Sequence, residues 1–266
     1  MQNILVTGGA GYIGSHCVKR LVTDGHHVTV LDNLDRGHRE AVEAAGGGKA
    51  TLEVVDLRDT DAVEAVLKKH SIEAVIHFAA LAYVGESVNE PLRYYDNNTA
   101  GSVSLLAAMG RAGVNRIVFS STCATYGEPT QDQMPISETL PQNPINPYGW
   151  SKLMTERALM DNATANAGFG FAALRYFNVA GSDPTGTIGE DHTPETHIIP
   201  VVLNCARWAR SRRSTSSAAT TTRPTARASA TTSTSRTWSM RTSRCSPHSG
   251  MATSGSTTSG RARARR

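Results

Sequence analysis

The chain has 266 residues, enough for one large domain or two small ones. Its composition, with 39% hydrophobic and 19% charged residues, excludes collagen-like and disulfide-scaffold proteins. No apolar run reaches the roughly 18–20 residues that a membrane span needs, and the strand-like N-terminus leaves no room for a secretory signal. The four cysteines, at positions 17, 123, 205 and 245, lack metal-binding spacing. We therefore expect reduced thiols, no metal and a cytoplasmic location.

The net charge of +4 averages two unlike segments. Residues 1–205 hold 14 Lys and Arg against 23 Asp and Glu, whereas residues 206–266 hold 13 Arg and no acidic residue. The second segment is rich in Ser, Thr and Ala and has no Leu, Ile, Val, Phe or Tyr. Such a composition cannot bury enough apolar surface to offset the entropy of ordering. It predicts a low-complexity, disordered basic tail.

Two interpretations of this tail compete: a nucleic-acid-binding arm and a sequence read out of frame. Reading the codons of 223–241 one nucleotide earlier permits TPDGTCIRDYIHVEDLVDA, which has acidic, aromatic and aliphatic residues in ordinary proportion. The codons of Trp238 and Met240 fix enough bases to make coincidence improbable. We favour the frameshift and expect no nucleic-acid partner.

Apolar runs alternate with helix-period segments along residues 1–205. Short buried strands are predicted at 4–6, 28–31, 74–76, 117–119 and 171–174, with a further strand ending near Val55. One-sided apolar faces predict helices between them; these faces comprise Ile13, Cys17, Leu21 and Val22, then Ala62, Val63, Val66 and Leu67, then Val103, Leu106 and Met109. Another helix is predicted at 150–160, after Pro147. This order predicts an α/β fold with a doubly wound parallel sheet.

A glycine-rich turn, Gly8 to Gly14, follows the first strand and opens the first helix. Such a turn brings backbone N–H groups close to the phosphates of a dinucleotide. Asp32 ends the second strand, where a carboxylate accepts hydrogen bonds from the adenosine ribose and repels a 2′-phosphate, which favours NAD over NADP. Arg36, four residues on, is a cation that argues the other way. Asp56 and Leu57 follow the third strand, where they are suited to contact adenine.

Tyr148 and Lys152 lie one helical turn apart, on one face of a predicted helix. An isolated phenol has a pKa near ~10, and a cation about 6 Å away would lower that pKa by roughly two units. Together with a positively charged nicotinamide, Lys152 would make Tyr148 a general base near neutral pH. The Ser120-Ser121-Thr122 run ends a strand nearby, where a hydroxyl can reach the same substrate oxygen.

The residues then match a known family. The chain resembles the extended short-chain dehydrogenases/reductases, and within them the UDP-glucose 4-epimerases; the matching segments are VTGGAGYIGSH, LDNL, VIHFAA, VGES, YYDNN, FSSTCATYG, NPYGWSKLMTE and LRYFNVAG. The resemblance covers nearly all of residues 1–204. It implies a Rossmann-like NAD-binding domain over 1–175, the start of a substrate-binding domain over 176–205, a homodimer, and a UDP-sugar as substrate.

The resemblance also implies roles for individual residues. The catalytic residues would be Tyr148 as base, Lys152 as its tuner, and Thr122 as a hydroxyl relay. The NAD-binding residues would be Gly8, Gly11, Tyr12, Ile13, Gly14, Asp32, Asn33, Asp56, Leu57, Phe78, Ala79, Ala80, Asn97, Tyr148, Lys152 and Tyr176. The substrate would meet Thr122, Tyr148 and Asn178, with His197, Ile198 and Ile199 near the uracil.

The implied reaction is the interconversion of UDP-glucose and UDP-galactose at C4 through a 4-keto intermediate. The family's Arg-Asp-Tyr-Ile-His-Val segment, whose Arg holds the diphosphate, survives only in the shifted frame across 230–235. The chain as written is therefore expected to be impaired, and a catalytically dead NAD-binding remnant is one alternative. An epimerase acting on UDP-glucuronate or UDP-N-acetylhexosamine is another. Cys123-Ala124 after the relay hydroxyl argues against a dehydratase, which needs an acid pair there.

Overall fold

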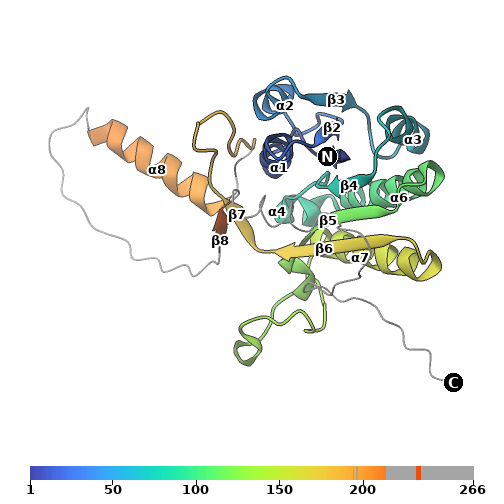
Figure 1. Ribbon diagram of the computed structural model, residues 1–266. Helices are drawn as coiled ribbons and strands as arrows, with labels where there is room; N and C mark the ends of the chain where they lie inside the picture. The colour runs from blue at the N-terminus through green and yellow to red at the C-terminus, as the bar shows by residue number, and fades with distance from the viewer. Residues whose placement is uncertain (194, 196, 214–231, 235–266) are drawn as a thin grey trace.

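The computed structural model describes residues 1–193, 195, 197–213 and 232–234. Its main sheet is parallel and six-stranded, in the order β3-β2-β1-β4-β5-β6, so that the chain winds outward in both directions from β1 (Figure 1). The strands are β1 (Asn3–Thr7), β2 (His27–Asp32), β3 (Ala50–Val54), β4 (Ala74–His77), β5 (Arg116–Thr122) and β6 (Gly170–Tyr176). The predicted doubly wound α/β fold is confirmed.

Helices cover both faces of the sheet. They are α1 (Tyr12–Thr23), α2 (Arg39–Gly46), α3 (Thr60–Lys69), α4 (Val84–Asn89), α5 (Pro91–Tyr94), a π-helix (Tyr95–Ala100), α6 (Gly101–Ala112), 3₁₀ turns at Cys123–Tyr126 and Gln131–Gln133, α7 (Pro147–Ala165) and α8 (Ile198–Arg213). Helices α3, α6 and α7 lie on one side, and α1 and α2 on the other (Figure 1). Among the described residues, no helix combines the length and apolarity needed to cross a membrane.

The strand period of two divides the core between the two faces. In β1, Leu5 points into the cluster formed with α3, α6 and α7, whereas Ile4 and Val6 point into the cluster formed with α1 and α2. All three side chains are fully buried. Because both faces of the central strands are covered, these strands read as continuous apolar runs, which is why the sequence reveals them.

Helix α7 begins earlier than predicted. The side chain of Asn146 accepts a hydrogen bond from the amide of Gly149 at 2.8 Å, and Pro147 occupies the first turn, where a missing N–H costs nothing. This start places Tyr148 in the first turn of the helix and Lys152 one turn later.

One residue of a predicted helical face is misplaced: Met109 is fully buried and Leu106 packs against the core, but Val103 does not face it. In α6 the side chains facing the core are Leu105, Ala108 and Met109, whereas Val103 is 49% exposed. Val103 lies on the solvent side because the small residues of this helix allow more than one apolar stripe.

The expected boundary at residue 205 falls within a helix and stays a prediction. Helix α8 runs on to Arg213 and projects away from the sheet (Figure 1). Strand β8 (Thr232–Thr234) pairs in parallel with β7 (Asn178–Ala180), so these short pieces of the predicted tail have secondary structure. The rest of the predicted disordered tail, 214–231 and 235–266, lies outside the described residues.

Candidate active site

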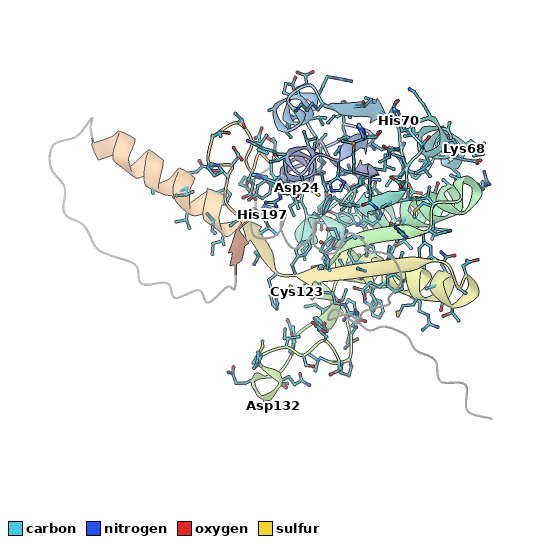
Figure 2. The ribbon with its side chains drawn as sticks, in the orientation of Figure 1. Asp24, Lys68, His70, Cys123, Asp132 and His197 are labelled. Carbon is cyan, nitrogen blue, oxygen red and sulfur yellow. The ribbon has the colours of Figure 1, made fainter. Side chains whose placement is uncertain are left out.

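A cavity of about 1260 Å³ lies at the carboxyl ends of the parallel strands, the usual ligand position in a doubly wound sheet. It exceeds the ~300–1,000 Å³ of typical small-molecule pockets, as an extended ligand requires. Nineteen of the predicted site residues line it: Gly8, Gly11, Tyr12, Ile13, Gly14, Asp32, Asn33, Asp56, Leu57, Phe78, Ala79, Ala80, Asn97, Thr122, Tyr148, Lys152, Tyr176, Asn178 and His197. In Figure 2, Cys123 and His197 mark the end of the molecule where this cavity lies.

Ile198 and Ile199 are exceptions to the predicted site. Their residues are 51% and 37% exposed on α8, and neither lines the cavity. The structure therefore does not bring the predicted uracil-contacting pair to the site. Both begin a helix that points away from the sheet (Figure 1).

The glycine turn is shaped by close backbone approaches. A Cβ on Gly14 would lie 2.0 Å from the carbonyl oxygen of Gly8, so only glycine allows α1 to begin so near β1. Gly8 has φ of +70°, and a Cβ there would meet the backbone of Ala79 at 2.5 Å. Gly11 caps α1, and its nearest contact would be 3.4 Å away, so a side chain there would extend into the cavity rather than the core. This turn fits the predicted phosphate-binding role.

Asp32 is fixed in place at the end of β2. Its carboxylate oxygens accept hydrogen bonds from the amides of Ala10, at 3.1 Å, and Leu34, at 2.9 Å. Burial raises the pKa of this carboxyl, and the two backbone bonds oppose the rise. Because each carboxylate oxygen has two acceptor positions, both oxygens can still accept hydrogen bonds from a ligand.

At the end of β3, Asp56 is shared among several polar partners. The guanidinium of Arg58 donates to it at 2.7 and 2.9 Å, and the amide of Asn33 donates at 3.1 Å. The hydrogen bonds from Arg58 hold the pKa of Asp56 well below its usual range. The carboxylate is therefore ionised at the cavity wall. The backbone amide of Arg58 also donates to it, at 2.9 Å, so each oxygen already accepts two hydrogen bonds, and an adenine amino group would have to displace one of these donors.

Tyr148, Thr122 and Lys152 converge on the cavity from α7 and β5. The amide of Ala124 donates to Thr122 Oγ1 at 3.1 Å, which leaves the Thr122 hydroxyl proton for its hydrogen bond with the phenol of Tyr148. Lys152 Nζ donates to the carbonyl of Ser120 at 2.9 Å and lies 5.9 Å from the centre of the Tyr148 ring. The predicted proximity of the three side chains is present in the structure.

The predicted lowering of the Tyr148 pKa is not present in this structure. Burial raises the pKa of Tyr148 to about 12, and the hydrogen bond from Thr122 only partly opposes this. Burial also lowers the pKa of Lys152 to about 7, against the attraction of Glu156. The prediction assumed a fully charged lysine at the dielectric of a surface pair; in the protein, desolvation of both groups outweighs their attraction.

A buried hydrogen-bond chain that the sequence analysis did not single out supports these elements. Ser102 donates to the carbonyl of Asn98, so Ser102 Oγ accepts from His77 Nε2 at 2.9 Å, and His77 Nδ1 accepts from Thr7 at 2.7 Å. Burial lowers the pKa of His77 to about 3, so the ring is neutral. Asn98 also donates to Ser151 of α7 at 3.0 Å. The π-helix, α6, α7 and β1 are thereby joined; each residue alone looks like an ordinary core polar group.

A second buried polar group fixes the outer side of α7. Arg175 Nη2 lies 2.6 Å from Glu156 Oε2, with side chains 7% and 2% exposed. Tyr126 accepts from Arg175 at 2.9 Å, and Ser121 donates to Glu156. The pair therefore ties α7 to the end of β5, which carries Thr122.

Arg175→Ala is expected to lower the free energy of unfolding by about 3–5 kcal/mol, because it leaves the buried Glu156 carboxylate without its cation. Urea denaturation measures this loss. Arg157→Ala is the matched control, since its pair with Asp161 has side chains 71% and 61% exposed and should contribute little. Equal losses in the two variants would contradict the account of the buried pair.

Just before α8, four side chains have potential metal-ligand atoms within 4.8 Å of one another: Glu190, His192, Glu195 and His197. His197 Nδ1 lies 3.0 Å from Glu190 and 2.9 Å from Glu195, and the bond to Glu190 raises the pKa of His197. These contacts explain the cluster as ion pairs between the imidazole and two carboxylates. The expectation of no metal stays a prediction.

The fold and site define a class: an α/β protein with a dinucleotide-type glycine turn, an acid at the end of β2 and a Tyr–Lys pair. The model of the NAD dependent epimerase/dehydratase family matches residues 4–222. The UDP-glucose 4-epimerase of Lacticaseibacillus casei is 52% identical over 209 residues, which cover 79% of this chain and 61% of that protein. The chain belongs to the NAD dependent epimerase/dehydratase family.

Solved structures of UDP-glucose 4-epimerases are also similar to this chain. The UDP-glucose 4-epimerase from Brucella ovis in complex with NAD superposes with a TM-score of 0.74 at 46% identity, covering 79% of this chain and 62% of that one. The UDP-glucose 4-epimerase from Stenotrophomonas maltophila, with bound NAD and formylated UDP-arabinopyranose, superposes with a TM-score of 0.75 at 41% identity. The match covers 79% of this chain and 63% of that one. This chain thus spans about three fifths of the length of these relatives.

Proposed function

We propose that this chain binds NAD in the cavity between the glycine turn and α7. The observation that carries this proposal is that Tyr148, Lys152 and Thr122 line the same cavity as the glycine turn and Asp32. The turn offers backbone N–H groups and a helix N-terminus to the pyrophosphate, and Asp32 offers an ionisable acceptor to the adenosine ribose.

We further propose that the complete protein inverts C4 of a UDP-hexose, interconverting UDP-glucose and UDP-galactose. Bound NAD⁺ would supply the hydride acceptor and later the hydride donor. Tyr148 would take the proton of the 4-hydroxyl group, assisted by Thr122, and return a proton after the 4-keto sugar has turned its other face. Lys152 would hold the phenolate by its charge. The names of the relatives support UDP-glucose, while UDP-N-acetylhexosamine and UDP-glucuronate remain alternative substrates.

For the chain as written, we propose NAD binding with negligible turnover. It spans only part of the length of its relatives, and Ile198 and Ile199 do not line the cavity. The codons of β8 (Thr232–Thr234) are those that read Tyr-Ile-His one nucleotide earlier, within the family's diphosphate-binding segment.

The test has two arms. Calorimetric titration of the purified chain with NAD⁺ should show a single saturable site, while incubation with UDP-glucose should yield no UDP-galactose above background. The gene should be resequenced through the Cys205 codon, and the protein translated in the restored frame should interconvert the two sugars. Absence of NAD⁺ binding would refute the proposed cofactor site. Absence of interconversion in the restored protein would refute the proposed reaction. Homodimer formation and a cytoplasmic location remain predictions from the family resemblance.

A further inference from the structure

A cluster of charged side chains closes one wall of the cavity beside Asp32. Arg36, in the loop between β2 and α2, donates to Glu86 Oε1 on α4 at 2.6 Å. Its guanidinium also lies 4.8 Å from the centre of the Tyr83 ring. The side chains of Arg36 and Glu86 are 32% and 21% exposed, so the ion pair is partly shielded from water. We call Arg36, Tyr83 and Glu86 the Arg36 clamp.

Glu86 is itself fixed by other groups. Its second oxygen accepts from the hydroxyl of Tyr94, a fully buried residue, at 2.7 Å. Arg93 donates to the same oxygen as Arg36, at 3.2 Å. The glutamate is therefore an oriented acceptor, and Arg36 is held at its guanidinium by the charge of Glu86 and across its plane by the ring of Tyr83.

The clamp lies next to the expected ribose position. A Cβ on Gly37 would come within 3.1 Å of Asp32 Oδ1, so the chain that carries Arg36 passes directly beside that carboxylate. Among the described residues that line the cavity, two carry a Lys or Arg side chain, Arg36 and Lys152. Lys152 donates to the carbonyl of Ser120, at the opposite end of the cavity from Arg36. Of these two, Arg36 is the cation on the side of the cavity where Asp32 lies.

In dinucleotide-binding folds, an arginine near the ribose accommodates the 2′-phosphate of NADP. Here that arginine is already paired. We propose that Glu86 determines cofactor specificity: by holding Arg36 in the clamp, it denies a 2′-phosphate its counter-ion and leaves that phosphate facing the carboxylate of Asp32. The conflict between Asp32 and Arg36 that the sequence poses is thereby settled in favour of NAD. This inference rests on the proposed NAD site.

The test compares the dissociation constants of NAD⁺ and NADP⁺, measured calorimetrically at one ionic strength. Glu86→Gln preserves shape and the hydrogen bond to Tyr94 but removes the closer of the two carboxylates that pair with Arg36, at 2.6 Å, against 3.7 Å for Asp35. It should shift the ratio of the two constants toward NADP⁺ by about tenfold, the size of a single charge-assisted contact. The double variant Glu86→Gln, Arg36→Gln should return to the wild-type ratio.

Two further variants keep the proposal falsifiable. Glu90→Gln removes a nearby negative charge that pairs with Arg93 but not with Arg36, and it should leave the ratio unchanged. Arg36→Gln alone should change NADP⁺ binding less than twofold, because its guanidinium is occupied by Glu86. A shift of less than twofold in Glu86→Gln, a gain that survives in the double variant, or a marked loss of NADP⁺ binding in Arg36→Gln would overturn the proposal. If the wild-type chain binds neither nucleotide, the proposed NAD site itself fails.

Discussion

Tyr148→Phe is expected to lower the rate of epimerisation by at least about two powers of ten in the protein translated in the restored frame, because a positioned general base contributes 10²–10⁴-fold. The ring that packs edge-on against Tyr94, with centroids 6.5 Å apart, stays in place, so only the phenolic hydroxyl and its bond with Thr122 are lost. The measurement is the initial rate of UDP-galactose formation from UDP-glucose. NAD⁺ affinity in the same variant should change little.

The wild-type rate should also rise with pH while Lys152 keeps its charge, since burial raises the pKa of Tyr148 to about 12 and the phenolate is its basic form. The rise should end above about pH 7, where Lys152 loses the charge that holds the phenolate. Tyr148→Phe should lose this rise. Tyr95→Phe serves as the control, because Tyr95 lies in the π-helix and does not line the cavity. Full activity in Tyr148→Phe, or an equal loss in the Tyr95 variant, would remove Tyr148 from its proposed role.

Gly14→Ala is expected to destabilise the whole domain by about 3 kcal/mol or more, because its Cβ would lie 2.0 Å from the Gly8 carbonyl oxygen and 2.7 Å from Gly9 Cα. Both neighbours are backbone atoms of a tight turn and cannot move aside as a flexible side chain would. Thermal and urea denaturation measure the loss. NAD⁺ binding should disappear together with the native turn.

Two glycine variants separate packing from binding. Gly110→Ala, in α6, meets no atom within 4 Å and should raise stability by about 0.5–1 kcal/mol. Gly11→Ala meets only Gly8 at 3.4 Å and should fold normally, yet it should weaken NAD⁺ binding because the new methyl group enters the cavity. If Gly14→Ala were as stable as Gly110→Ala, the close approach of α1 to the turn would not be a requirement of this fold.

Most of the fold could be predicted because its signals are local. The buried strands are short apolar runs such as Ile4 to Val6, and glycine and acidic residues at their ends indicate the edge where a ligand binds. The phase of an alanine-rich helix is a weaker signal, which is why Val103 was placed on the wrong face. Helices α4 and α5 are too short to show a period.

The candidate site, like the fold, could be predicted from the sequence only in part. Residues in recognisable motifs, such as Asp32 and Tyr148, could be predicted, and the structure brings them to one cavity. The clamp of Arg36 by Glu86 could not be predicted, because the two residues are 50 positions apart and meet only after the sheet has formed. The pKa of Tyr148 could also not be predicted from the sequence, since it depends on how deeply the packed protein buries the phenol.

A crystal structure of this chain grown with NAD⁺ would show whether one cavity holds the dinucleotide with its reactive end beside Tyr148. We expect the pyrophosphate against the turn from Gly8 to Gly14, the adenosine ribose hydrogen-bonded to Asp32, and the nicotinamide between Lys152 and Tyr148. A cavity without cofactor at saturating NAD⁺, or a nicotinamide turned away from Tyr148, would contradict it.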